Sequence, residues 1–310
     1  MIQIKQLSKR YGALIAVDNL SFQVEPGEVL GFLGPNGAGK STTMKMIAGF
    51  LSPSSGSVSV CGFDIEAEPL KAKQALGYLP EGAPAYGEMT PRGFLGFIGD
   101  LRGMEPALKA RRIGVVIEQL GLRDVMEQPI ETLSKGFKRR VGIAQAILHD
   151  PRVLILDEPT DGLDPNQKHE VRKLISGMAK DKLIVVSTHI LEEVHAVCTR
   201  AIVISGGKLL ADATPDQLEA RSRYHGAVSL RSADPEPIRL ALSEIADVES
   251  VELDARDGSL TAVPKPGKRI FEAVSEIVSK RGFAVHDLIL ERGRLDEVFR
   301  SITEQRGARS

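Results

Sequence analysis

The chain has 310 residues, of which 42% are hydrophobic and 26% charged, and its formal net charge is -1. This is the composition of an ordinary globular protein, with room for one large α/β domain or for two domains. The balanced charge argues against a nucleic-acid-binding chain, and its two cysteines, Cys61 and Cys198, indicate neither a disulfide framework nor a metal cluster, which favours a reducing cytosol.

Apolar segments in this sequence are short. The start, MIQIKQLSKRYG, lacks the apolar core of a secretory signal, and no apolar run approaches the ~20 residues that span a bilayer. The longest runs are VLIL (153–156), LIVV (183–186) and AIVI (201–204), which are typical of buried parallel strands. Any role at a membrane is therefore expected to be peripheral, through a partner.

Along the chain, residues 1–33 predict a β-rich start, with Pro26–Gly27 as a turn between two strands. From 34 to about 205, helical patterns alternate with short apolar strands. This alternation predicts a parallel sheet with flanking helices, the α/β class.

The pattern changes after about residue 220. Residues 227–300 predict strand, helix, strand, strand, helix, strand and helix, which resembles a small α+β module of ferredoxin-like type. Beyond residue 220 there are 15 Lys or Arg and 15 Asp or Glu residues, so this part is neutral. We therefore expect two domains, residues 1–220 and 221–310, the second without a nucleic-acid-binding role.

A glycine-rich loop ends one predicted strand and enters a helix. Gly34, Gly39, Lys40 and Ser41 fit the pattern G-x-x-x-x-G-K-[ST], in which backbone N–H groups surround phosphate oxygens. Lys40 would reach the β- and γ-phosphates, and the Ser41 hydroxyl would bind Mg²⁺. A chance match is expected in about one chain in a hundred of this length. The candidate phosphate-binding residues are Gly34, Pro35, Asn36, Gly37, Ala38, Gly39, Lys40, Ser41 and Thr42.

Two adjacent carboxylates follow the VLIL strand, where ligands bind in parallel α/β sheets. Asp157 could bind Mg²⁺ or its water, and Glu158 could orient and polarise the attacking water. A solvated turn would explain the following DG and DP pairs, but it explains Glu158 poorly. We expect Asp157 to be a metal ligand and Glu158 to be catalytic.

With these two motifs, the sequence resembles an ATP-binding subunit of an ABC transporter over residues 1 to about 220. The resemblance implies a P-loop ABC ATPase domain, followed here by the small α+β C-terminal domain. Such a domain has a parallel core sheet, an antiparallel β subdomain and a helical signature subdomain. It also implies ATP and Mg²⁺ as cofactors.

The same resemblance extends to three single residues. Tyr11 falls where an aromatic ring stacks on adenine, although a hairpin tyrosine is the alternative. Asp164 falls in the loop that signals between the two nucleotide sites. His189 resembles the switch histidine that contacts the γ-phosphate, which makes it a second catalytic candidate.

LSKGFKRR (133–140) occupies the place of the family's LSGGQ signature. Ser134 and the backbone amides of Lys135 and Gly136 would meet the γ-phosphate of an ATP held by the opposite subunit. Lys135 and Phe137 depart from the family's Gly and Gln. The neighbouring Arg139 and Arg140 are expected to face solvent, acidic neighbours or the surroundings of their own helix.

Glu81 stands where the family usually has Gln, in the loop that touches Mg²⁺ and contacts the membrane subunit. It could be a tolerated variant, because both side chains offer an oxygen. Alternatively, its added charge changes metal affinity and the rate of hydrolysis. Either reading places Glu81 among the nucleotide- and metal-binding candidates.

Glu81, the LSKGF variant and the tail GRLDEVFRSIT (293–303) together resemble the ABC-2-type exporter branch, including gliding-motility-like ATPases. This branch implies a separate integral membrane permease, docking on its cytoplasmic face, and a second ATPase subunit, in a homodimer or a heterodimer.

Two alternative functions predict different sequence features. A soluble ABC-type ATPase acting on ribosomes or nucleic acid predicts two nucleotide-binding units or a long coiled-coil insertion. A non-hydrolysing regulatory P-loop protein would be expected to lack Lys40 or Glu158.

Overall fold

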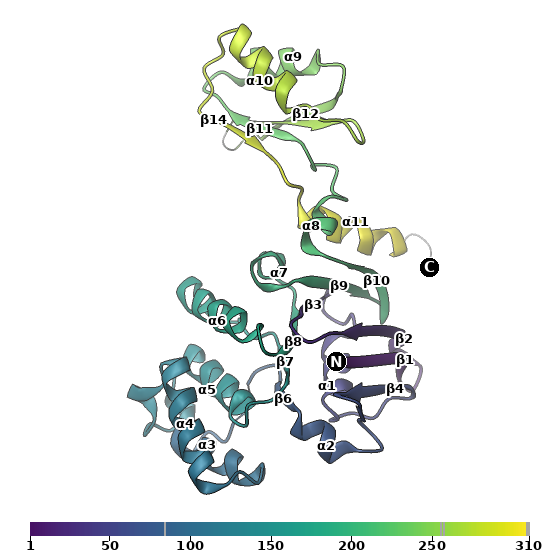
Figure 1. Cartoon of the computed structure of the whole chain (residues 1–310). Helices are drawn as coiled ribbons and strands as arrows, with labels where there is room; N and C mark the ends of the chain where they lie inside the picture. Colours follow the sequence, from purple (N-terminus) through teal and green to yellow (C-terminus); the bar gives the residue numbers. More distant parts are fainter. Residues whose placement is uncertain (84, 255, 257, 308–310) are drawn as a thin grey trace. The chain divides into compact units, whose positions relative to one another are not determined.

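The computed structural model describes residues 1–83, 85–254, 256 and 258–307. They form two compact units, Met1–Ala213 and Thr214–Ser310 (Figure 1). The predicted boundary at residue 220 falls a few residues inside the second unit. Among the described residues, no helix has both the length and the hydropathy of a membrane-crossing segment.

The first unit contains two sheets. The smaller sheet is antiparallel, with strand order β2-β1-β4-β5. Its strands are β1 (Ile2–Tyr11), β2 (Leu14–Val24), β4 (Ser55–Val60) and β5 (Phe63–Asp64). The β-rich start predicted for residues 1–33 is confirmed by β1, β2 and β3 (Val29–Leu33), a strand of the larger sheet.

The larger sheet has the order β10-β9-β3-β8-β7-β6, and all its neighbouring pairs are parallel except β10 with β9. The three apolar runs VLIL, LIVV and AIVI lie in β7, β8 and β9, as predicted. The strands are β3 (Val29–Leu33), β6 (Leu76–Leu79), β7 (Val153–Asp157), β8 (Leu183–Thr188), β9 (Arg200–Ser205) and β10 (Lys208–Ala213).

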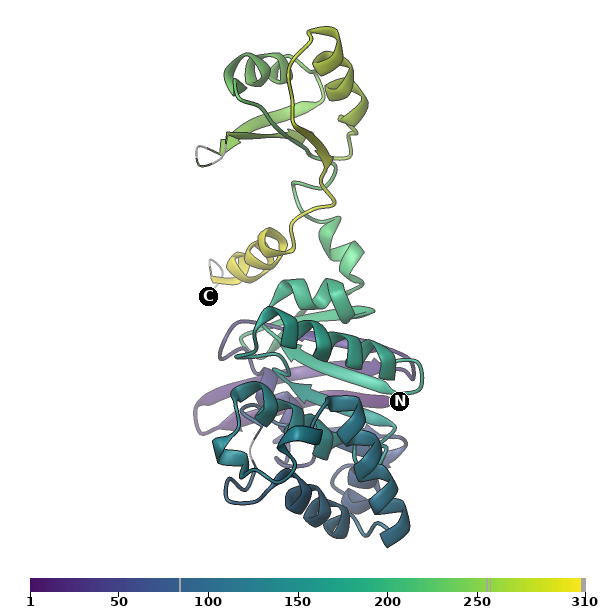
Figure 2. The same cartoon turned by 90° about the vertical axis from the view of Figure 1, so that its left-hand side faces the viewer.

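Helices flank this parallel sheet. Several of them begin at a proline, whose fixed φ suits the first helical position and whose missing N–H costs nothing there. In Figures 1 and 2, α3, α4 and α5 gather on the side of the parallel sheet opposite the antiparallel sheet. The helices are α1 (Lys40–Ile47), α2 (Pro69–Gln74), α3 (Pro91–Leu101), α4 (Pro106–Leu120), α5 (Lys135–Ile147), α6 (Pro165–Met178) and α7 (Leu191–Val197).

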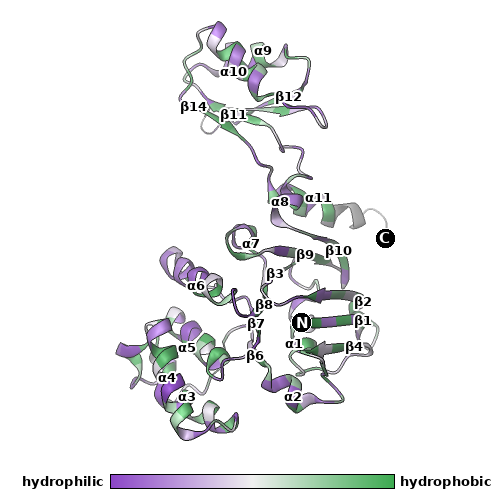
Figure 3. Ribbon diagram, viewed as in Figure 1, coloured by the Kyte–Doolittle hydropathy of each residue, from purple (hydrophilic) through white to green (hydrophobic). Residues whose placement is uncertain are grey.

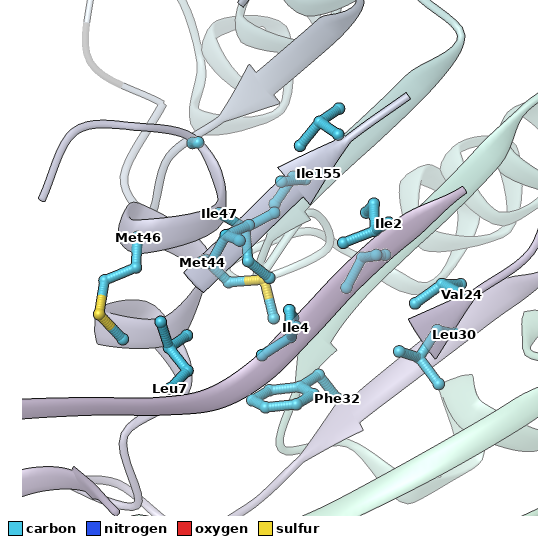
Figure 4. Close-up of a cluster of buried hydrophobic side chains, with 14 of the residues drawn as sticks. Ile2, Ile4, Leu7, Val24, Leu30, Phe32, Met44, Met46, Ile47 and Ile155 are labelled. Atoms are coloured by element: carbon cyan, nitrogen blue, oxygen red, sulfur yellow. The ribbon is translucent and has the colours of Figure 1, made fainter. Parts of the chain in front are cut away.

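The parallel sheet is buried on both faces. Ile155 of β7 belongs to a core that also holds residues of β1, β3 and α1, shown in Figure 4, whereas Leu154 and Leu156 face a second core with α3–α6. Burying each such side chain contributes about 1.5–3 kcal/mol. The helices carry both hydrophilic and hydrophobic residues, as expected of elements with one buried face (Figure 3). This packing fixes the ends of β3, β7 and β8, where the predicted site residues lie.

The second unit contains an antiparallel sheet with strand order β12-β13-β11-β14. Its strand and helix order is the βαββαβ order expected for a ferredoxin-like module, with helices at both ends of the unit. The elements are α8 (Pro215–Glu219), β11 (Val228–Arg231), α9 (Pro235–Ser243), β12 (Val248–Asp254), β13 (Ser259–Pro264), α10 (Phe271–Lys280), β14 (Asp287–Leu290) and α11 (Leu295–Gly307).

The segments that enter and leave this sheet run side by side. The Gly226 N–H donates to the Glu291 carbonyl at 3.0 Å, and the Glu291 N–H donates to the Ala227 carbonyl at 2.8 Å. Further out, α8 contacts α11. Gly293 has a φ of 124°, and a Cβ there would lie 2.1 Å from the Glu219 carbonyl oxygen, so only glycine fits this crossing.

Candidate functional site

The glycine loop joins β3 to the start of α1. Gly39 has a φ of 103°, and a Cβ at this position would lie 2.4 Å from the Ala16 carbonyl oxygen, so the loop requires glycine here. Pro35, Asn36 and Gly37 are exposed at the tip of the loop, whereas Ala38 and Gly39 are buried. The loop therefore combines an exposed backbone with a fixed entry into α1, whose N-terminus carries positive partial charge.

Lys40 is the first residue of α1 and is buried. Its ammonium group donates to the carbonyl oxygens of Gly34, at 2.7 Å, and Pro35, at 3.3 Å. The same nitrogen lies 3.9 Å from Glu158 Oε1. The lysine charge is thus held inside the loop, where phosphate oxygens could replace the carbonyl partners. Thr42 is half-buried in the first turn of the helix.

Three predicted metal-site residues meet at one hydroxyl group. Ser41 Oγ lies 3.4 Å from Asp157 Oδ1 and 3.5 Å from Glu81 Oε2. Asp157 is fully buried at the end of β7, whereas Glu81 is exposed in the loop after β6. Residues 116 and 40 positions away from Ser41 along the chain therefore converge on it.

This cluster fits a divalent cation. Asp157 Oδ1 accepts a hydrogen bond from Ser187, but Asp157 Oδ2 is buried with no partner among the described residues. An unpaired buried carboxylate oxygen is costly unless a cation neutralises it. With the hydroxyl of Ser41 and the carboxylate of Glu81, Asp157 provides the oxygen ligands that Mg²⁺ prefers.

Glu158 and His189, the two predicted catalytic residues, are in direct contact. Glu158 Oε2 lies 2.9 Å from His189 Nδ1. Burial raises the pKa of the Glu158 carboxyl, and His189 and Lys40 oppose this rise. His189 is half-exposed, so one side of the pair is open to a ligand. A carboxylate with a raised pKa beside a lysine is suited to orient a water molecule and accept its proton.

The backbone of Glu158 is held in an uncommon conformation. Its φ is 50°, which non-glycine residues adopt rarely. Its N–H donates to the Ser187 carbonyl oxygen at 3.2 Å and lies 3.1 Å from Ser187 Oγ. Ser187 pairs with Asp157 in the parallel register of β7 and β8. One serine of β8 thus holds both members of the acidic pair.

The signature-like residues lie at the start of α5. Ser134 caps this helix and accepts from the Phe137 N–H at 3.4 Å. A Cβ at Gly136 would lie 2.5 Å from the Gln167 side chain of α6, so this glycine permits close helix packing. Lys40, Ser41, Asp157, Glu158 and His189 are called the Lys40 cluster below. No hydrogen bond or ion pair among the described residues joins Ser134, Lys135 or Gly136 to this cluster. Their role toward a second subunit's nucleotide stays a prediction.

Asp164 and Tyr11 also lie apart from the Lys40 cluster. Asp164 caps α6 by accepting from the Gln167 N–H at 2.9 Å. Tyr11, at the end of β1, is 48% exposed, and the Lys9 ammonium lies 5.5 Å from its ring centroid. Stacking by Tyr11 and signalling by Asp164 both stay predictions.

Sequence reasoning missed two residues at the site, Ser187 and Tyr78, and left the surroundings of a third, Arg139, open between alternatives. Ser187 lies two positions before His189 in VVSTH, but only the strand register reveals its contacts with Asp157 and Glu158. The Tyr78 hydroxyl is buried with no partner among the described residues, and burial, Asp157 and Glu81 raise its pKa. Arg139 is buried beside acidic neighbours, so the solvent-facing alternative is wrong for it.

Arg140, in contrast, is only half-buried. Its guanidinium donates to the Leu120 carbonyl oxygen at 3.1 Å and lies 5.8 Å from the Phe137 ring centroid. It keeps to the surroundings of its own helix, which is one of the alternatives considered for this pair.

Comparison with known proteins gives a consistent result. A family model described as "ABC transporter" matches residues 17–161. The chain is 36% identical over 253 residues to the linearmycin resistance ATP-binding protein LnrL of Bacillus subtilis, covering 81% of each protein. It is 39% identical over 223 residues to the probable multidrug ABC transporter ATP-binding protein YbhF of Escherichia coli. That match covers 72% of this chain but only 38% of YbhF.

Solved structures agree with these sequence matches. A structure titled as an ATP-binding subunit of an ABC transporter is 31% identical, with a TM-score of 0.66 over 71% of this chain and 92% of that one. A dimeric ATP-binding cassette, MJ0796, bound to ADP and Pi in a post-hydrolysis state, is 21% identical with a TM-score of 0.64. It covers 69% of this chain and 99% of that one, and supports the fold.

Proposed function

The chain belongs to the ABC transporter family of ATP-binding proteins, and we propose that it is the ATP-hydrolysing subunit of an ABC-2-type exporter. Two ATPase subunits close around two ATP molecules with Mg²⁺, and hydrolysis reopens them. The ATPase docks on the cytoplasmic face of a separate integral membrane permease. The relatives named for multidrug transport and linearmycin resistance support this transport role.

The convergence of Lys40, Ser41, Asp157, Glu158 and His189 on the end of the parallel sheet carries this proposal. In it, Lys40 exchanges its loop carbonyl partners for the β- and γ-phosphate oxygens of ATP. Ser41, Asp157 and Glu81 hold Mg²⁺, which when bound supplies positive charge against the phosphates. These residues act mainly by positioning the reacting groups and neutralising charge.

Glu158 and His189 carry out the step at the γ-phosphate. Glu158 orients the attacking water and accepts its proton, because burial raises the pKa of this carboxyl. The water oxygen bonds to the γ-phosphorus as the bond to the β–γ bridging oxygen breaks, which leaves ADP and phosphate. His189 holds the Glu158 carboxylate through their 2.9 Å contact and faces the γ-phosphate from its exposed side.

An exposed aromatic surface supports the docking of a partner protein. Tyr86 is 59% and Phe97 is 41% exposed, and their rings meet edge to face with centroids 5.7 Å apart. They line an open hollow of about 680 Å³ that begins a few residues after Glu81. Large exposed aromatic residues around a hollow are typical of a docking surface for a protein. Glu88 and Glu131 also line the hollow, and their negative charge disfavours a nucleic acid as the partner.

The Glu158→Gln variant tests the proposed function. Glutamine keeps the size of the side chain but cannot accept the proton, so we expect ATP binding to persist and turnover to fall at least about a hundredfold. The ATP-bound variant should also accumulate as a dimer in size-exclusion chromatography with ATP and Mg²⁺. Glu170→Gln, an exposed change on α6, is the control. Unchanged turnover in a monomeric Glu158→Gln protein would contradict the proposal.

A further inference from the structure

Helix α5 carries a buried arginine that none of the steps above uses. Arg139 is only 6% exposed. One guanidinium nitrogen, Nη2, donates to the Asp161 carbonyl oxygen at 3.4 Å, whereas Nη1 is buried with no partner among the described residues. Burying a guanidinium with an unsatisfied nitrogen costs free energy. If this position served only to fill the core beside α5, an apolar side chain would stabilise the protein more. Arg139 therefore requires an explanation other than packing.

The surroundings of Arg139 are acidic. Burial lowers the pKa of its guanidinium, and the carboxylates of Asp161, Glu158, Asp157 and Glu81 oppose this change, in that order. Arg139 is thus a buried cation of α5 near the loop after β7, while Lys40, at the start of α1, lies 3.9 Å from Glu158 Oε1. The charge of Arg139 offsets the repulsion among carboxylates that the site brings together.

The loop after β7 also packs against the start of α5. The Lys135 side chain lies beside Gly162, since its Cδ would be at an ordinary contact distance of 3.6 Å from a Cβ at that glycine. Gly136 packs on Gln167, just after the loop. Arg139 lies three residues after Gly136, so it shares the same face of α5. Its hydrogen bond to Asp161 is therefore part of the contact that holds residues 158–164 on this helix.

We propose that Arg139 is a positioning residue that holds the loop of residues 158–161 so that Glu158 is presented to the nucleotide. The proposal rests on the proposed function, because it assigns Glu158 its role. Arg139 acts through Asp161 and through its charge, without touching the phosphates. An arginine is needed because the task combines a donor to a backbone carbonyl with a permanent positive charge.

The test compares the full-length wild type with Arg139→Gln, Arg139→Lys and Arg140→Gln. Arg140→Gln is the matched control, because Arg140 is the next residue of α5 and contacts Leu120 and Phe137. Three quantities are measured: the kcat for ATP, the KM for ATP, and the hydrogen exchange of a peptide covering residues 158–164 without nucleotide. The exchange measurement reports how readily this segment opens and does not depend on catalysis.

We expect Arg139→Gln to lower kcat at least about tenfold while KM for ATP stays within about twofold. In the same variant, residues 158–164 should exchange at least about tenfold faster. Arg139→Lys keeps the charge and should recover part of both effects, and Arg140→Gln should match the wild type. Wild-type kcat and exchange in Arg139→Gln would overturn the proposal, as would equal losses in Arg140→Gln.

If Arg139→Gln does not fold, a second variant, Arg139→Met, tests the proposal. Arg139→Met fills the same space without charge, so wild-type kcat and exchange in this variant would overturn the proposal. Failure of the proposed function is recognised separately, since a wild-type chain that does not hydrolyse ATP defeats it before any variant is compared. Normal wild-type turnover with a normal Arg139→Gln protein defeats only the assignment of Arg139.

Discussion

The Ser41 hydroxyl lies close to two carboxylates whose surroundings differ. Asp157 is fully buried and held by Ser187, whereas Glu81 is exposed and reaches the hydroxyl from a loop. A cation at Ser41 would therefore meet one fixed ligand and one that can withdraw. The exposed ligand is the better position at which to adjust metal affinity, since its removal leaves no buried group unpaired.

The Glu81→Gln variant tests whether this exposed carboxylate sets the affinity of the site for Mg²⁺. Glutamine keeps an oxygen near the metal but removes the charge, so basal ATPase activity should survive within about tenfold, roughly 1.4 kcal/mol in barrier terms. The Mg²⁺ concentration for half-maximal activity should rise, because one negative charge is lost beside the cation. Glu66→Gln, an exposed change outside the site, is the control in the same Mg²⁺ titration. An unchanged titration would support the tolerated-variant interpretation instead.

His149 should make folding sensitive to mild acid. Its Nε2 lies 3.1 Å from the Leu76 carbonyl oxygen, and burial, with Arg102, lowers the pKa of the ring to about 4. In the unfolded chain the ring binds protons near pH 6.5, so its stabilising contribution is present above that pH and is lost as pH falls toward 4. On the order of 1–2 kcal/mol should be lost from this group between pH 7 and pH 5.

Urea unfolding at pH 7 and pH 5 measures this loss. His149→Gln removes the titrating ring but can still donate to the Leu76 carbonyl, so its free energy of unfolding should depend less on pH than that of the wild type. His225, an exposed histidine, provides the control substitution. Equal pH dependence in His149→Gln and the wild type would show that this ring does not titrate on unfolding.

The sequence predicts candidate site residues where they belong to a recognisable motif. It does not predict which side chains those residues contact. Lys40 and Ser41 were predicted from the spacing of the glycine motif, and Asp157 and Glu158 from their place after an apolar strand, because both patterns reflect local geometry. Ser187 and Arg139 act through residues distant in sequence, so only the strand register and helix packing reveal them. A basic octapeptide gives no sign that Arg139 is buried while Arg140 is not.

At the scale of elements, the apolar runs predicted β7, β8 and β9 because a parallel strand with two buried faces requires continuous apolar residues. The same reasoning could not predict which strand lies beside which. In particular, β3 lies between β8 and β9, although more than 140 residues separate it from β8 in the sequence. Strand order depends on tertiary packing, and it is this order that brings His189 to Glu158.

The N-terminus of α5 should act on the nucleotide of the other subunit. We predict that Lys40→Ala and Ser134→Arg proteins, each nearly inactive alone, recover activity when mixed. A mixed dimer has one complete site, with Lys40 of one subunit and Ser134 of the other, and one site that lacks both. Equal mixing makes about half the dimers mixed, so activity should approach roughly a quarter of wild type if the sites work independently.

The measurement requires proof that mixed dimers form, for example by tagging one variant and recovering both. A dimer of one wild-type and one Lys40→Ala subunit, which has a single intact site in either arrangement, is the control for cooperation between sites. If that control turns over while confirmed mixed dimers of the two single variants do not, each subunit completes its own site and the trans arrangement is excluded.

At the scale of the whole molecule, the two compact units suggest independent folding. β10 ends at Ala213, and α8 belongs to the second unit because it contacts α11. A chain ending at Ala213 should therefore fold and bind ATP with nearly wild-type affinity, although its dimer could form less readily. A longer chain ending at Arg221 would keep α8 without its partner helix, so we expect it to be no more stable.

Nucleotide binding by the shortened chain can be followed by thermal shift with ATP. Lys40→Ala in the same shortened chain is the control, since it keeps the fold and removes the phosphate contact. A shortened chain that is folded but binds no ATP would show that the second unit contributes to the nucleotide site.

The paired entry and exit segments of the second unit have an evolutionary consequence. Because Gly226 and Glu291 are hydrogen-bonded neighbours, the sheet between them is inserted into the chain as a block whose two ends adjoin. Blocks with adjoining ends are gained, lost or exchanged by recombination without rethreading the rest of a protein. Gly293, which lets the returning chain pass against Glu219, marks the junction at which such an exchange would have to keep its geometry. ATPases sharing the first unit can thus acquire different accessory modules while their nucleotide site stays intact.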